Sequence, residues 1–177
     1  GLPRSRRSLN LPDMSNVSDP GREYGRVRHA VLLGLFCGTG VGLGYLLSFA
    51  PGVELMTTNA ALAGAALGPA GGVIVGVLTQ GVYSLGSPYG PPLPQVLAAQ
   101  VVGMAVAGLA GGLLGPLARR LPGRVAAALT AVAGLGVSLF YDLVTNVAVA
   151  AALAMPLPGV LLAGAPLAGV HALVVAT

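Results

Sequence analysis

One short segment combines a carboxylate, a phenol, hydroxyls and an amide within about two helical turns. The segment runs from residue 138 to residue 146 and contains Tyr141, Asp142 and Asn146, whereas the sequence around it is mainly Ala, Gly, Leu and Val. A carboxylate facing the centre of a bilayer costs about 3 kcal/mol, so membrane proteins usually turn it toward a cavity or a partner. Asn146 follows Asp142 by one turn and shares its helix face. We interpret the segment as one wall of a substrate site; the alternative is a buried hydrogen bond from Asp142 to a neighbouring helix.

Further polar residues stand at positions where they could complete such a site. Glu54 could bind a substrate, or it could cap the helix that follows it, where the helix dipole favours a carboxylate. His171 could be a ligand or a packed histidine bonded to a backbone carbonyl. Tyr45 and Tyr141 could also be interfacial anchors. The candidate substrate-binding residues are Glu54, Thr58, Asn59, Tyr83, Tyr89, Gln95, Asp142, Asn146 and His171.

No catalytic pattern is present in the sequence. There is no HExxH pair, no serine at a nucleophile turn with matching His and Asp, and no lysine for a phosphate-binding loop. Cys37 is the single cysteine, so no disulfide within the chain is possible. We therefore expect neither an enzyme, nor a metal site, nor a covalently bound cofactor, and the chain cannot hydrolyse ATP by itself.

The composition is that of an integral membrane protein. Of the 177 residues 55% are apolar and only 8% are charged, whereas a soluble domain has about a quarter of its residues charged. Residues 1–28 are basic and polar, and we expect them to form a disordered cytoplasmic segment, with Met14 as a candidate start of the natural chain. Residues 29–177 are expected to form the membrane domain. Arginines confined to short segments beside apolar spans argue against nucleic acid as a partner.

Apolar runs separated by Pro and Gly residues predict an all-α bundle of six transmembrane helices. The Gly68-Pro69 pair between two of these runs predicts a tight helical hairpin. The fifth run is longer than a bilayer needs, so it is either one tilted helix or a helix broken near Gly134 and Gly136. The spans lie at about 29–49, 55–67, 70–86, 95–115, 125–155 and 159–177.

The distribution of arginine predicts how these spans are oriented. Six of the nine arginines precede residue 29, and the other three lie between residues 119 and 124. The positive-inside rule then places both termini and the 116–124 loop in the cytoplasm. Asp142 falls about 27 Å along its helix from that loop, toward the outer side, where Glu54 also maps. This asymmetry predicts a pocket that opens outward rather than a pore.

Small residues recur at helical spacing in two of the spans. Ala30, Gly34, Gly38 and Gly42 form one stripe. The other consists of Gly103, Ala107, Gly111 and Gly115. Such stripes allow helices to approach closely, so we expect them to pack inside the bundle or, in one case, against a partner.

Three strings in this framework resemble those of the S component, the membrane-embedded subunit of energy-coupling factor (ECF) transporters. They are PGVELMT at residues 51–57, the AG…LGP hairpin at 63–69 and YDLVTN at 141–146, together with the Gly/Pro-rich loop at 83–94. The resemblance covers residues 29–177. It implies a six-helix subunit that captures a vitamin, a vitamin precursor or a metal ion outside the cell. An N-terminal histidine cluster, typical of the metal-capturing relatives, is absent, and a neutral or cationic small molecule fits the two acids better.

The resemblance also implies partners. An S component docks onto a transmembrane T component that carries two ATPases, so ATP would act only through these subunits, in the cytoplasmic (inner) membrane of a bacterium or archaeon. S components commonly offer the T component a surface of small residues on the first helix, and the matching positions are Ala30, Gly34 and Gly38. Two other functions remain open: a structural or assembly protein held by its glycine stripes, and a small ion-coupled secondary transporter using Asp142.

Overall fold

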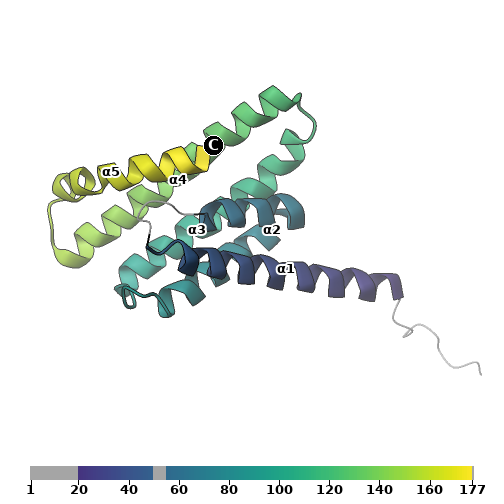
Figure 1. Cartoon of the computed structure of the whole chain (residues 1–177), viewed down its shortest axis with the longest axis horizontal. Helices are drawn as coiled ribbons and strands as arrows, with labels where there is room; N and C mark the ends of the chain where they lie inside the picture. Colours follow the sequence, from purple (N-terminus) through teal and green to yellow (C-terminus); the bar gives the residue numbers. More distant parts are fainter. Residues whose placement is uncertain (1–19, 50–54, 177) are drawn as a thin grey trace, which may run out of the picture.

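The computed structural model describes residues 20–49 and 55–176, and this part of the chain is all-helical, without strands (Figure 1). Four of its helices, α1 to α4, are long and apolar enough to cross a membrane. The prediction of an all-α, multi-pass membrane protein is confirmed at this level. The five helices are α1 (Pro20–Leu46), α2 (Met56–Leu85), α3 (Pro94–Ala118), α4 (Gly123–Leu153) and α5 (Leu157–Ala176).

The helix α2 is folded back on itself at Gly68. This residue has φ 85° and ψ 172°, which are not helical and which glycine tolerates, and Pro69 follows it. A Cβ atom on Gly72 would lie 2.6 Å from Cα of Gly64, although an unbroken helix would separate these residues by about 12 Å. The hairpin predicted at Gly68-Pro69 is therefore present. The predicted second and third spans are the two arms of α2, so the described chain has five helices where we expected six.

In one segment the structure differs from the prediction, and in another it selects between two predicted alternatives. The helix α1 begins at Pro20, so residues 20–28, which we expected to be disordered, are helical. The helix α4 is continuous from Gly123 to Leu153, which selects one long helix over a helix broken near Gly134. It ends where Ala154 adopts a left-handed conformation, φ 52°.

The helices pack in chain order. In the described residues the substantial contacts are those of α1 with α2, α2 with α3, α3 with α4 and α4 with α5, and Figure 1 shows α5 lying along α4, on the opposite side of the molecule from α1. The arrangement is an open row rather than a closed bundle. Large apolar side chains on α1, α4 and α5 consequently remain exposed, among them Leu35, Leu139 and Leu162.

The closest contact in the row is between the α2 hairpin and α3, where glycines bring backbone against backbone. A Cβ on Gly72 would lie 2.3 Å from the carbonyl oxygen of Gly108, and one on Gly64 only 2.0 Å from the same oxygen. On α3, a Cβ on Gly111 would lie 1.9 Å from the oxygen of Ala61. The stripe of small residues predicted for this span is thus confirmed as a packing surface.

The stripe on α1 behaves differently. Ala30, Gly34 and Gly38 are exposed, and a Cβ on either glycine would meet nothing within 4 Å. The glycines of α1 that meet α2 are instead Gly40, beside Asn59 and Thr79, and Gly44, beside Met56 and Tyr83. The predicted stripe therefore takes no part in packing within the described chain.

Two hydrogen bonds show which loops share an end of the molecule. Arg119 Nη1 donates to the carbonyl oxygen of Ala65, 2.9 Å away, so the α3–α4 loop lies beside the tip of the α2 hairpin. At the opposite end the Tyr89 hydroxyl bonds to the carbonyl oxygen of Ser48, which joins the α2–α3 loop to the residues after α1.

The glycine contact predicts a large effect of one methyl group. Gly108→Ala would place a Cβ 2.1 Å from the carbonyl oxygen of Gly72, so we expect the free energy of unfolding in detergent to fall by about 1–3 kcal/mol. Gly136→Ala on α4 is the matched control, because a Cβ there meets nothing within 4 Å. Equal stability of the two variants would contradict this view of the α2–α3 contact.

Candidate functional site

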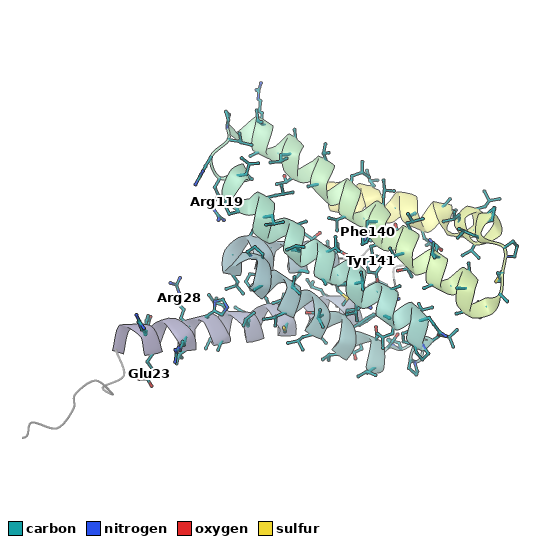
Figure 2. All side chains as sticks on the ribbon, turned by 180° about the vertical axis from the view of Figure 1, so that it is seen from behind. Glu23, Arg28, Arg119, Phe140 and Tyr141 are labelled. Carbon is teal, nitrogen blue, oxygen red and sulfur yellow. The ribbon has the colours of Figure 1, made fainter. Side chains whose placement is uncertain are left out.

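An acid–imidazole pair joins α4 to α5. Asp142 Oδ1 lies 3.2 Å from His171 Nδ1, and the side chains are 20% and 5% exposed. Asp142 is the one acidic residue in the sequence after Glu54. Figure 2 labels the neighbouring Tyr141 in the middle stretch of α4, away from the labelled charged residues on α1 and at the end of α3. The pair therefore lies within the apolar part of the helix row.

Tyr141 connects this pair to the core. Its side chain is 8% exposed and packs in a cluster with Met56 and Met104. Its ring and the His171 ring form a T-shaped contact, with centroids 5.8 Å apart and planes at 88°. A Cβ on Gly103 would lie 2.4 Å from the Tyr141 ring, so the small residue on α3 makes room for the phenol. Tyr141 is thus a core residue that orients His171, and not the interfacial anchor considered from the sequence.

Asn146 lies on the same side of α4 as Asp142, one turn further along. Its Nδ2 donates to the backbone carbonyl oxygen of Asp142 at 2.8 Å, so the amide does not bond to the carboxylate. Its amide faces α5, since a Cβ on Gly164 would lie 3.0 Å from Oδ1 and 3.2 Å from Nδ2. One hydrogen of the NH₂ is bonded to the helix backbone, and the amide group borders the space between α4 and α5.

The second oxygen of the Asp142 carboxylate, Oδ2, is buried and has no hydrogen-bond partner within the described residues. An unmet buried acceptor costs about 1–3 kcal/mol, so this oxygen marks a position where a donor would be stabilised. Asp142 and Asn146 border a groove of about 460 Å³ between the two helices. The other lining residues are Leu139, Leu143, Leu161, Gly164, Ala165, Ala168 and Gly169.

The remaining predicted residues lie in other neighbourhoods. Asn59 Nδ2 donates to the carbonyl oxygen of Phe36, 2.9 Å away, and so ties α2 to α1. Tyr83 packs its ring on Tyr45 with centroids 5.4 Å apart. Gln95 is exposed at the start of α3.

Two further predicted residues, Thr58 and Tyr89, also lie away from the Asp142–His171 pair. Thr58 borders a separate cavity of about 200 Å³ between α2, α3 and α4, lined mostly by Ala, Gly and Leu. Tyr89 bonds to Ser48 in the loop region. Glu54 lies outside the described residues. The structure thus brings together Asp142, Asn146 and His171, and the substrate-binding role of each of the nine residues stays a prediction.

A buried polar cluster that sequence reasoning did not single out joins α2 to α3. Gln80, 2% exposed, donates through Nε2 to Ser84 Oγ at 2.9 Å and to Gln100 Oε1 at 3.2 Å. Its signal in the sequence was a glutamine within an apolar span, the same kind of signal that singled out Asp142. Because the bond from Gln80 to Gln100 runs between α2 and α3, we assign the cluster to helix packing.

Comparison of the chain with models of protein families, with curated proteins and with solved structures found no match. The geometry of the pair is therefore the basis for a functional argument. An acid–imidazole pair in an apolar setting can accept a proton or hold a ligand that donates hydrogen bonds or carries positive charge. In the part of the chain that the structure describes, no three His, Cys, Asp or Glu residues are grouped so as to hold a metal ion.

A double-mutant cycle measures whether Asp142 and His171 interact as a pair. We expect Asp142→Asn and His171→Phe to be coupled by about 0.5–3 kcal/mol in the free energy of unfolding, because the first removes the carboxylate charge and the second the ring nitrogen of the same contact. His29→Phe is the matched control, since His29 is exposed on α1, and its effect should add to that of Asp142→Asn. Additive effects of Asp142→Asn and His171→Phe would show that the pair contributes no interaction energy.

Proposed function

We propose that the chain is the substrate-capture subunit of an ECF-type ATP-driven importer and binds a vitamin, a vitamin precursor or a similar neutral or cationic small molecule. The observation that carries the proposal is the position of Asp142, paired with His171 inside the helix row and bordering a groove with one carboxylate oxygen unpaired. Ionisable residues inside a membrane are costly, and they usually mark a substrate or ion site. The resemblance of residues 141–146 to the S components points in the same direction.

The proposed topology has six crossings and both termini in the cytoplasm, with the two arms of α2 forming the second and third. Arginines support this orientation: α1 carries Arg22, Arg26 and Arg28 near its N-terminus, and Arg119 closes α3. Figure 2 shows the labelled Arg28 and Arg119 toward one side of the molecule. With that side in the cytoplasm, Asp142 lies about 28 Å along α4 from Gly123, toward the outside. The membrane would be the cytoplasmic membrane of a bacterium or archaeon.

The exposed stripe on α1 supports a membrane partner. Ala30, Gly34 and Gly38 form an exposed face, and a Cβ on either glycine would meet nothing within 4 Å; such faces favour close helix association in a bilayer. We propose that this face docks the T component. Because the sequence contains no lysine for a phosphate-binding loop, two separate ATPase subunits would supply the energy.

A second candidate is a small ion-coupled secondary transporter. The Asp142–His171 pair favours it, because acid and imidazole groups inside membranes also relay protons. A third, a structural or assembly protein, is favoured by the open row, which leaves α1, α4 and α5 with apolar faces that a partner could cover. The importer differs from both in requiring ATPase subunits and a captured small molecule.

Reconstituted transport separates these candidates. The cargo, identified by mass spectrometry of small molecules that co-purify with the chain, should accumulate in liposomes only when T component, ATPases and ATP are present. Asp142→Asn should lower this uptake about tenfold or more, because a hydrogen bond to a charged group is worth about 1.5–3 kcal/mol. Glu23→Gln, a change of an exposed acid on α1, is the matched control and should leave uptake unchanged.

Two outcomes would reject the importer. Uptake by the chain alone under a proton gradient would assign it to secondary transport. Failure to recover ATPase subunits with the chain, together with wild-type behaviour of Asp142→Asn apart from a lower melting temperature, would favour the structural role.

A further inference from the structure

We propose that the groove between α4 and α5 is the ligand site and that it takes a compact apolar molecule bearing one protonated amine. The inference rests on the proposed function in that it names the class of cargo and the place where it binds. It follows from three properties of the groove: its acceptors, its charge and its shape.

The polar side chains that line the groove are those of Asp142 and Asn146. Asp142 Oδ2 is buried without a partner in the described chain, while Oδ1 is engaged by His171. Asn146 Nδ2 donates one of its two hydrogens to the Asp142 carbonyl oxygen, and both its Nδ2 and its Oδ1 lie beside Gly164 of α5, so the amide offers a donor and an acceptor there. A ligand that satisfies both oxygens must donate hydrogen bonds. An amine has enough donors for both, whereas an alcohol has one.

The charge of the groove selects a cation. The sequence has no Arg or Lys between residues 29 and 118 or after residue 124, and the basic side chain that contacts Asp142 among the described residues is His171. An imidazole with its proton on Nδ1 can donate to Oδ1 and remain neutral. A protonated amine would pair with an ionised Asp142 carboxylate at hydrogen-bond distance. A carboxylate ligand would instead face Asp142 with like charge, where repulsion is strong because the surroundings are apolar.

The shape of the groove selects a small apolar body. Its volume of about 460 Å³ lies within the range of small-molecule sites, about 300–1,000 Å³. Gly164, Ala165, Ala168 and Gly169 form a smooth wall on α5, opposite the leucines of α4. Gly164 has a specific role, because a methyl group there would lie 3.0 Å from Asn146 Oδ1 and crowd the amide oxygen.

The groove also lies on the flank of the helix row. Leu139, Leu143 and Leu161, which line it, are 51%, 49% and 36% exposed. In the described chain α5 has its substantial contacts with α4 alone, so no other helix closes this side. An amphiphilic amine could therefore reach Asp142 from the outer leaflet, with its apolar body on the leucines and its amine at the carboxylate.

Three probes with the same phenylalkyl body test the class of ligand: phenethylamine, 2-phenylethanol and 3-phenylpropionate. Binding of each radiolabelled probe to the full chain in neutral phosphatidylcholine nanodiscs is measured by equilibrium dialysis, with empty nanodiscs correcting for partition into lipid. We expect phenethylamine to bind at least about tenfold more tightly than the other two, as a charge-assisted bond would give. Asp142→Asn and Gly164→Ala should each weaken amine binding at least about threefold, and Gly136→Ala should not.

Measurements on the variants separate loss of the amine site from unfolding and from loss of transport. The melting temperatures of all variants are measured alongside. If Asp142→Asn unfolds, Gly164→Ala, which adds one methyl group, still tests the site. Equal binding of amine and alcohol, no binding of any probe, or wild-type amine binding by Gly164→Ala would overturn the groove as an amine site. ATP-dependent uptake of a different cargo could still occur in that case. Amine binding without any ATP-dependent uptake would instead leave the site standing and reject the importer.

Discussion

The backbone contact between the α2 hairpin and α3 is the constraint on which the rest of the structure depends. Gly64 and Gly72, one on each arm of the hairpin, both approach Gly108 so closely that a single methyl group would overlap its carbonyl oxygen. In a bilayer, helices gain little from hiding apolar side chains from one another, so close packing of small residues is a main source of association. This contact brings together Met56 and Met104, which form the core with Tyr141.

The candidate site depends on this core through Tyr141. Gly103 leaves space on α3 for the phenol ring, and that ring makes a T-shaped contact with His171, which in turn lies beside Asp142. The position of the acid–imidazole pair is thus set by a chain of contacts that begins at α3. Since α5 has its substantial contacts with α4 alone, the pair is also one of the polar interactions that join the last helix to the rest.

Buried polar side chains among the described residues differ in where their hydrogen bonds go. Asn59 and Gln80 each donate one hydrogen bond to a neighbouring helix, to the carbonyl of Phe36 and to Gln100, so they stabilise the row itself. Asp142 borders a groove, and one of its carboxylate oxygens is buried without a partner among the described residues. Polarity within an apolar segment identifies all three residues, and only the structure shows which of them borders the groove.

The sequence by itself determined the membrane class, the helical content, the hairpin at Gly68-Pro69 and the pairing of Asp142 with Asn146 on one face. These follow from composition, from the backbone preferences of Gly and Pro, and from the 3.6-residue period, all of which are local. Only the tertiary structure decided that His171 meets Asp142, that Tyr83 and Asn59 lie elsewhere, and that the α1 stripe stays exposed while Gly40 and Gly44 meet α2. The physical reason is that these outcomes depend on which face each helix turns to its neighbour, and small apolar residues on every side of α1 and α3 leave that choice to packing across the row.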